Sequence, residues 1–547
     1  MSAILLIVVA AALLLVAYIV YGGWLARRWG IDAKNIAPSH AKEDGVDFVP
    51  TAKQILIGHH FSSIAGAGPI TGPIQAAVFG WVPVFLWIMV GGIFFGGVHD
   101  YGALVASMRH EGKSIGEVIH ANMGKKGKTL FSLFSFLTLI LVVAAFTDVV
   151  ATTFINSAAA GISSMLFILI AIAFGIAVYR KGVPIGIATV IGLVLMGLAI
   201  YLGLTLQNVI VLPKIAWVII LIIYIAIAST APVWILLQPR DYLNSFLLYS
   251  MIAGAFVGII LARPTLQLPA FTEFKLSQYN MLFPMLFVTV ACGAISGFHS
   301  LVSSGTTSKQ IDNEKDAKLI GYGSMLIESL LAVISLIAAA VLTREGLANG
   351  GSPINIFANG CANFMNAFGL PVDVGVIFVS LAISAFALTS LDTATRLARF
   401  VFQEFFSKGE VGTESAVDES NLLTNKYFAT LITVVLGGGL ALKGYQVVWP
   451  IFGSANQLLA ALALMAVAVW LRRDGKGYNM ILIPMAFMFA VCLSALVLVF
   501  MSNLAKGGYI MVVISAILFA LAIVLLIEGI KIFTDPNTKG QRLKAQN

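Results

Sequence analysis

Apolar residues in this chain run in long stretches that short polar segments separate. A helix needs about 20 mostly apolar residues to cross a membrane, and fifteen stretches approach or exceed that length. The predicted spans are residues 3–22, 56–80, 82–107, 129–156, 160–178, 184–206, 215–237, 243–262, 281–303, 319–342, 374–400, 425–442, 448–470, 479–501 and 510–532. The pattern predicts an all-α, polytopic membrane protein with about 15 transmembrane helices.

The composition agrees with this pattern. Hydrophobic residues make up 59% of the 547-residue chain and charged residues 11%, whereas soluble domains are about 45–50% apolar and about 25% charged. This balance excludes a disordered, collagen-like or disulfide-rich chain. The three cysteines, Cys292, Cys361 and Cys492, are spaced too widely for a zinc motif, so we expect buried thiols and no metal or organic cofactor.

The distribution of positive charge predicts an orientation. When the fifteen spans alternate between two sides, 27 of the 33 Lys and Arg fall on one side and 6 on the other. Cytoplasmic loops carry the excess of Lys and Arg. No basic residue precedes the apolar run Ala3–Val20, unlike in a secretory signal. We therefore expect the N-terminus outside and the C-terminus in the cytoplasm.

Two predicted spans contain the same interruption. Residues 64–70 and 227–233 both read Ile-Ala, three small residues, Pro and a β-branched residue. The two segments lie five spans apart and so cross in opposite directions, which is typical of an inverted-topology repeat. A simple proline kink is the alternative interpretation.

The repeat predicts a five-plus-five architecture with broken helices. The expected parts are an N-terminal transmembrane helix with a cytoplasmic loop (1–55), a first repeat (56–206), a second repeat (215–405), peripheral helices (425–535) and a cytoplasmic tail (536–547). A broken helix exposes backbone groups inside the membrane, which is tolerated where they line a cavity or bind a ligand. The N-terminus of the second half-helix favours a carboxylate, and the carbonyls of the first half favour a cation.

Polar side chains beside the two interruptions are candidates for substrate binding. The predicted residues are His59, His60, Ser62, Ser63, Gly66, Ala67, Gly68, Ser229, Thr230 and Ala231. For the two histidines, a hydrogen bond to a neighbouring helix is the alternative role.

Ionisable and hydroxyl side chains at membrane depth are candidates for ion or proton coupling, because they are costly to bury. His99 and Asp100 are adjacent and suit a paired dyad, and Asp148 has no basic neighbour in the sequence. The predicted set is His99, Asp100, Asp148, His299, Ser303, Ser304 and Thr307. Packing is the alternative role for each. We interpret Glu328 as structural.

Asp392 and Arg396 stand four residues apart in one predicted span. This spacing suits an intrahelical ion pair, which is either a satisfied pair near the cytoplasmic boundary or a gate at the inner mouth.

Motifs of common enzymes are missing. No complete P-loop, zinc-protease motif or nucleophile elbow occurs in the sequence, so we expect no enzyme.

Three segments resemble the carbon starvation protein A (CstA) family. They are Gly58–Ile70 (GHHFSSIAGAGPI), Val98–Tyr101 (VHDY) and Leu391–Ala398 (LDTATRLA). The resemblance is clearest over residues 1–405. It implies uptake of pyruvate or small peptides across the bacterial inner membrane, with cation coupling. The five-plus-five repeat is similar to the LeuT-type fold, which implies that spans 2 and 7 carry the substrate and that Ser303, Ser304 and Thr307 lie near a sodium-type site.

The combined reading is a secondary symporter, coupled to H⁺ or Na⁺, that imports a small carboxylate or peptide by alternating access. Its expected partners are that substrate and the lipid bilayer, and no nucleic acid. One alternative is a metal-ion transporter that uses His59, His60 and His299; no carboxylate or thiolate lies in either predicted break. The other is a membrane-embedded sensor or enzyme.

Overall fold

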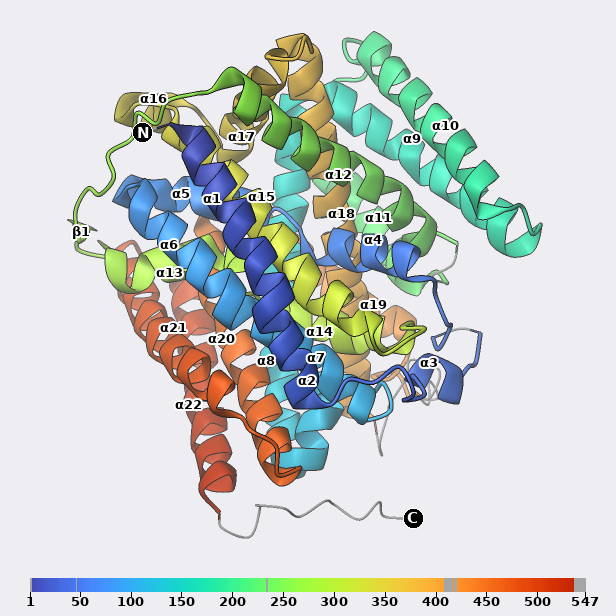
Figure 1. Cartoon of the computed structure of the whole chain (residues 1–547), viewed down its shortest axis with the longest axis vertical. Helices are drawn as coiled ribbons and strands as arrows, with labels where there is room; N and C mark the ends of the chain where they lie inside the picture. The colour runs from blue at the N-terminus through green and yellow to red at the C-terminus, as the bar shows by residue number, and fades with distance from the viewer. Residues whose placement is uncertain (1, 46, 233–234, 408–416, 418–420, 536–547) are drawn as a thin grey trace.

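The computed structural model describes residues 2–45, 47–232, 235–407, 417 and 421–535, and these are mostly helical (Figure 1). The predicted tail, 536–547, lies outside the described residues.

The described residues of the first half of the chain form twelve α-helices. They are α1 (Ala3–Val16), α2 (Gly22–Trp29), α3 (Pro38–Ala41), α4 (Lys53–Ile64), α5 (Gly68–Ala76), α6 (Trp81–Gly91), α7 (Gly97–Arg109), α8 (Ile115–Asn156), α9 (Ala158–Gly175), α10 (Ile185–Leu206), α11 (Lys214–Thr230) and α12 (Leu237–Ala262). Single π-helical turns continue α1 into α2 and α6 into α7.

A short hairpin of β1 (Lys275–Ser277) and β2 (Asn280–Met281) precedes the second half. Its helices are α13 (Phe287–Val290), α14 (Gly297–Gly305), α15 (Ser324–Ala340), α16 (Arg344–Asn349), α17 (Pro353–Asn366), α18 (Val372–Phe406), α19 (Lys426–Ala441), α20 (Tyr445–Arg473), α21 (Asn479–Ala505) and α22 (Tyr509–Thr534).

Twelve helical segments of the described chain are long and apolar enough to cross a membrane, fewer than the fifteen predicted spans. Two further apolar helices, α11 and α19, are shorter. The predicted span 56–80 is not one helix, because it is divided between α4 and α5.

The centre of the molecule is built on the long helices α8 and α18, which make the most extensive helix–helix contact. The helix α20 packs along α8, and its apolar part is fully buried. By contrast, α9 and α10 lie side by side at the edge of the molecule, and α21 and α22 flank another side (Figure 1). Their many exposed apolar residues suit contact with lipid.

The predicted break in the span 56–80 is confirmed. The first half, α4, ends at Ile64, and Ala65 leaves the helical conformation with ψ 59° before α5 starts at Gly68. A second helix is broken in the same manner: α13 ends at Val290, Ala291 has a φ of +45°, and α14 begins after the extended residue Ser296.

These two breaks touch each other. A Cβ atom on Gly68 would lie 2.6 Å from the Cβ and Sγ atoms of Cys292, and one on Gly72 would lie 2.5 Å from the carbonyl oxygen of Val290. Real Cβ atoms are not found that close to other atoms. Glycine at both positions therefore lets the two broken helices pack backbone to backbone.

The prediction that the second break follows Ser229 is wrong. The helix α11 ends at Thr230, and Ala231 adopts an extended ψ of 150° before Pro232. The residue before a proline avoids the helical region, so this proline terminates a helix and does not interrupt a span. The partner of the first break lies in the predicted span 281–303.

The contacts of the two broken helices are reciprocal. Helix α5 packs on α15, which follows the second broken helix, and α14 packs on α7, which follows the first. The next helices, α8 and α18, pack on each other. Likewise, α19 and α20 contact α8 while α11 and α12 contact α18.

These reciprocal contacts support a five-plus-five repeat with boundaries that differ from the predicted ones. We assign the repeats to residues 53–262 and 282–473, with α9–α10 inserted in the first and α16–α17 in the second. These limits differ from the predicted ones, 56–206 and 215–405, which start the second repeat at α11. The peripheral set 425–535 shrinks accordingly to α21 and α22.

Loops that were predicted to share one side of the membrane meet in the structure. The segment before α4 contacts the segment after α14, since the His40 Nε2 and Asp312 Oδ1 atoms lie 2.8 Å apart and the Thr51 amide donates to Gln310. On the side predicted to face outward, the loop after α12 accepts two hydrogen bonds. The Ala3 amide donates to the carbonyl of Pro264, and the Trp81 amide donates to the carbonyl of Pro269. The start of α1 and the end of α22 lie at opposite ends of the molecule (Figure 1).

Candidate functional site

The last two turns of α4 place four polar side chains at the first break. His59, His60, Ser62 and Ser63 are all buried. The Ser62 hydroxyl donates to the carbonyl of Asp241, and the Ser63 carbonyl accepts a hydrogen bond of 2.9 Å from the Ser390 hydroxyl.

Several polar atoms beside the break have no hydrogen-bond partner within the described part of the chain. They are the Nε2 atoms of His59 and His60 and the hydroxyl of Ser63. Burial of an unpartnered polar group is costly, and such groups are concentrated where a ligand binds. These atoms can therefore offer hydrogen bonds to a substrate or to water.

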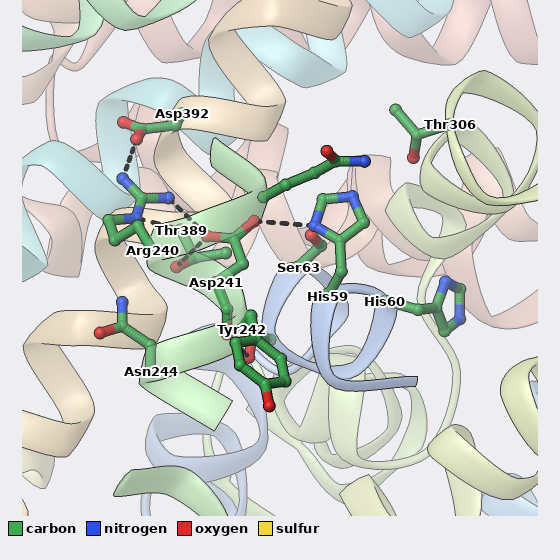
Figure 2. Close-up of polar contacts among 12 residues, drawn as sticks. His59, His60, Ser63, Arg240, Asp241, Tyr242, Asn244, Thr306, Thr389 and Asp392 are labelled. Atoms are coloured by element: carbon green, nitrogen blue, oxygen red, sulfur yellow. Dashed lines mark hydrogen bonds and ion pairs between the residues drawn. The ribbon is translucent and has the colours of Figure 1, made fainter. Parts of the chain in front are cut away.

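A buried chain of charges leads away from His59 (Figure 2). The Nδ1 atom of His59 lies 3.0 Å from Oδ2 of Asp241, and the Asp241 Oδ1 atom accepts a hydrogen bond of 2.8 Å from Nη2 of Arg240. The same guanidinium group forms an ion pair with Asp392. The chain thus joins α4, α12 and α18, and every member is at most 3% exposed.

Hydroxyl groups complete this network. Thr389 donates to Oδ1 of Asp241 at 3.0 Å, and Tyr224 donates to Oδ2 of Asp392 at 2.7 Å. With both carboxylates ionised, Arg240, Asp241 and Asp392 carry one net negative charge, which one proton on His59 or on either carboxylate would cancel. Figure 2 shows His59 directed at Asp241 and His60 directed away from it.

Arg240 and Asp241 were missed by sequence reasoning. They fall between two predicted spans, so Arg240 was counted as a loop residue. In the structure they belong to the first turns of α12 and are buried. The available signal is an Arg-Asp pair in the short segment between the apolar runs 215–237 and 243–262.

A small cavity lies next to His59. Its lining comes from α4, α12, the end of α14 with the following turn, and α18: His59, Leu237, Gly305, Thr306, Lys309, Thr393, Arg396, Leu397 and Phe400. The two cationic side chains, Lys309 and Arg396, favour an anion at this position.

The predicted pair of Asp392 and Arg396 is replaced by other contacts. In the described part of the chain, Asp392 pairs with Arg240, and the Nη1 atom of Arg396 donates to the carbonyl of Ala231 at 2.9 Å. Tertiary packing turns Asp392 toward α12, so the helical spacing of four residues does not decide its partner.

The second predicted substrate segment does not join the first break. The hydroxyl of Thr230 donates back to carbonyls of its own helix, that of Ser229 lies 3.4 Å from the Thr430 hydroxyl, and Ala231 accepts from Arg396. Gly66 instead lies near Phe146 and Ser390, and Gly68 near Cys292, while Ala67 is the residue that precedes α5. The reason is that α11 ends before it reaches the other break.

The predicted His99–Asp100 pair is present, with 2.7 Å between His99 Nδ1 and Asp100 Oδ1. Asp100 also lies 2.7 Å from Nδ1 of His299, whose Nε2 atom is 3.5 Å from Glu328. All four side chains are fully buried. Glu328, which we had interpreted as structural, belongs to this cluster.

Asp148 lies apart from both clusters and has a basic partner. Its Oδ1 atom is 2.6 Å from Nζ of Lys214, and its Oδ2 atom accepts a 2.7 Å hydrogen bond from the Tyr445 amide. Lys214 is 66 residues away in sequence and 47% exposed, so only the fold reveals the pair, in which Asp148 itself is buried.

The three hydroxyl residues predicted to lie together near His299, namely Ser303, Ser304 and Thr307, have different partners. Thr307 lies 2.8 Å from Nδ1 of His60, and Ser304 accepts from the Ile115 amide and donates to the Ser300 carbonyl. Ser303 has no partner within the described residues. Within the described residues, the contacts of these three hydroxyls therefore do not gather them around one point.

Comparisons with known proteins agree on the family. The model for "Carbon starvation protein CstA" matches residues 2–349 and 343–495. The peptide transporter CstA of Campylobacter jejuni is 34% identical over 563 residues, which cover 90% of this chain and 79% of the relative. The pyruvate/proton symporter BtsT of Escherichia coli is 30% identical over 585 residues, with coverage of 90% and 80%.

Solved structures show a more distant similarity. A manganese transporter of Eremococcus coleocola aligns with a TM-score of 0.46 and 13% identity over 89% of this chain and 99% of its own. A Na⁺-coupled sialic acid symporter aligns with a TM-score of 0.46 and 12% identity over 98% of each chain. The sequence matches carry the assignment: this chain belongs to the carbon starvation protein CstA family of membrane transporters.

Proposed function

We propose that this protein is a proton-coupled symporter of the bacterial inner membrane that imports a small carboxylate such as pyruvate, or a short peptide, by alternating access. The named substrates of its relatives support this class, because peptides and pyruvate both carry a carboxylate. We also propose that it acts by transport alone, with the N-terminus outside and the C-terminus in the cytoplasm.

The substrate carboxylate binds, in this proposal, at the first break and leaves through the cavity beside His59. Ser63 and His60 offer unpartnered polar atoms at the break, and the N-terminus of α5 begins at Gly68. An anion is favoured at a helix N-terminus. Lys309 and Arg396 extend the positive potential along the cavity.

The coupling proton is assigned to His59. This single arrangement carries the proposal: one ring nitrogen of His59 faces the Asp241–Arg240–Asp392 network, and the residue also lines the cavity. Protonation of His59 cancels the net charge of the network, and a neutral network is easier to move through a low-dielectric interior. His59 thereby links the charge of the site to the movement of helices.

A proton is favoured over sodium by the contents of the network. The guanidinium group of Arg240 pairs with both Asp241 and Asp392, so a permanent cation already occupies the position between the two carboxylates where Na⁺ would have to bind. The hydroxyls of Ser304 and Thr307 are engaged by Ile115 and His60.

We further propose that Asp392 and Arg396 act in gating, each through its own partner. Asp392 ties α18 to α12 through Arg240, and Arg396 ties α18 to the end of α11 through Ala231. Movement of α18 relative to α11 and α12 has to break both contacts.

The deciding experiment is uptake of labelled pyruvate into proteoliposomes with an inward proton gradient, a sodium gradient, or neither. We expect accumulation only with the proton gradient. The variant His59→Gln should lose accumulation at least 10-fold but keep exchange of internal for external substrate, because exchange needs no net proton movement. The matched control is His40→Gln, since His40 is exposed and outside the network.

Other outcomes separate the parts of the proposal. Uptake that follows sodium alone would refute proton coupling. Normal accumulation by His59→Gln would remove His59 as the proton carrier. If pyruvate is not taken up by folded protein, the same vesicles are tested with di- and tripeptides, which decides between the two substrate classes.

A further inference from the structure

A second buried cluster lies at the other break and is not used by the proposed transport mechanism. Cys292 belongs to the turn Ala291–Gly293, His299 to the first turn of α14, and Glu328 to α15. The Cys292 thiol, a ring nitrogen of His299 and a carboxylate oxygen of Glu328 all lie within 4.8 Å of one another. The three side chains are 4%, 0% and 0% exposed.

The Cys292 thiol accepts a hydrogen bond from the Asn456 side-chain amide at 3.6 Å, but the nitrogen and oxygen atoms that face it are not satisfied by the protein. The Nε2 atom of His299 and both carboxylate oxygens of Glu328 have no hydrogen-bond partner among the residues that the structure describes. The closest approach between them is 3.5 Å, from His299 Nε2 to Glu328 Oε2. Because unpaired buried polar groups are costly, three of them converging on one point indicate a bound species.

The second layer of contacts orients the histidine toward that point. The Nδ1 atom of His299 lies 2.7 Å from Asp100, and the other oxygen of Asp100 lies 2.7 Å from His99. A histidine that binds a metal through one nitrogen usually donates the other N–H to a carboxylate, which fixes the ring. Asp100 stands in that position and leaves Nε2 directed at Cys292 and Glu328.

The charges and atom types identify the bound species. A thiolate and a carboxylate together balance a divalent cation, which matters in a buried site. Sulfur, imidazole nitrogen and carboxylate oxygen form a ligand set that zinc accepts, and zinc sites with an open position have three protein ligands. The sequence-based objection to metal binding, that no thiolate or carboxylate lies in a break, disappears because the second break contains Cys292 and faces Glu328.

We propose that Cys292, His299 and Glu328 form a binding site for a divalent transition-metal ion of the zinc class. The ion joins the second break to α15, and through Asp100 to α7. The three ligands share no residue with the His59 network, although Cys292 packs against Gly68 of the first break, so metal binding is tested by readouts that need no transport.

The first test measures metal content of the full-length protein purified from cells grown with added zinc. We expect about one zinc per chain, falling to a tenth or less in Cys292→Ser, His299→Asn and Glu328→Gln. Cys361→Ser and Cys492→Ser are matched controls, since both remove a buried cysteine elsewhere and should keep the metal. Asp100→Asn should weaken binding about 10–100-fold, as expected for an outer-layer carboxylate.

The second test uses Co²⁺ in place of zinc. A thiolate-to-cobalt charge-transfer band that is present in the wild type and in Cys361→Ser, but absent in Cys292→Ser, would support the site. Purified wild-type protein without metal under zinc and cobalt supplementation would overturn it. Equal metal content in the wild type and all three ligand variants would overturn it as well. Neither readout requires transport, so the metal site and the proposed function can fail independently.

Discussion

Buried ion pairs connect the helices around the first break. Arg240 is 2% exposed and contacts two carboxylates, Asp241 and Asp392, on two helices. Removing one partner of a buried ion pair leaves an uncompensated charge, which costs about 3–5 kcal/mol. The guanidinium is therefore the structural centre of the network, whereas His59 carries the coupling proton only in the function proposed above.

The variant Arg240→Gln is expected to lose about 3–5 kcal/mol of stability because both carboxylates lose their counterion. Thermal unfolding in detergent measures the loss. The double variant Arg240→Gln/Asp392→Asn should recover part of it, since one uncompensated charge is removed. Arg344→Gln is the matched control, because Arg344 is exposed at the start of α16. Equal stability of Arg240→Gln and the control would contradict the central role of Arg240.

At the scale of the helix, the two breaks depend on glycines that admit close packing. The first break needs space at Gly68, where the second break presents Cys292, and at Gly72, where it presents the Val290 carbonyl. Added atoms in a packed interior cost about 1–3 kcal/mol and shift neighbouring groups. The geometry of one break is thus coupled to that of the other.

Gly68→Ala is expected to lower stability by about 1–3 kcal/mol, and Gly68→Leu to abolish uptake while the protein still inserts. The double variant Gly68→Ala/Cys292→Gly should regain stability, because the Cβ and Sγ atoms that the new Cβ would meet at 2.6 Å are then absent and the Cα atom of residue 292 lies at an ordinary 3.8 Å. Proteoliposome uptake and thermal unfolding measure both effects. The control is Gly439→Ala in α19, where an added Cβ meets nothing within 4 Å. Normal uptake by Gly68→Leu would remove the break from the mechanism.

At the scale of the whole molecule, the two assigned repeats, residues 53–262 and 282–473, make reciprocal contacts. Such an arrangement is compatible with movement of one group of helices against another. Each broken helix packs on the helix that follows its counterpart, and α8 packs on α18 between them. In transporters with inverted repeats, alternating access is largely a rocking of such groups around a fixed site. The cavity at His59 lies on the side where the segments around His40 and Asp312 meet.

The orientation of the molecule can be tested by labelling engineered cysteines, because all three native cysteines are buried. Lys275→Cys in β1 should react with an impermeant maleimide on intact cells. Lys34→Cys, in the loop between α2 and α3, should react only after the membrane is opened. Both positions are exposed. The reverse pattern of labelling would show that the molecule is inserted the other way.

The sequence by itself determined the class of the protein and one of its two breaks. Long apolar runs can only be buried in lipid or in a helix bundle, so the membrane helices follow from local composition. The segment Gly58–Ile70 combines glycine, proline and polar residues, and therefore it both breaks the helix and carries the family resemblance. The pairing of His99 with Asp100 is also local.

Only the tertiary structure decided which distant residues meet. Asp392 stands next to Arg396 in the helix, yet it pairs with Arg240, which is 152 residues away. The second break was assigned to Pro232 from a short match, whereas packing places it at Ala291–Ser296, opposite Gly68. A sequence pattern reports the conformation of its own segment. The partner of a buried charge or of a helix break depends on long-range packing, which no single segment encodes.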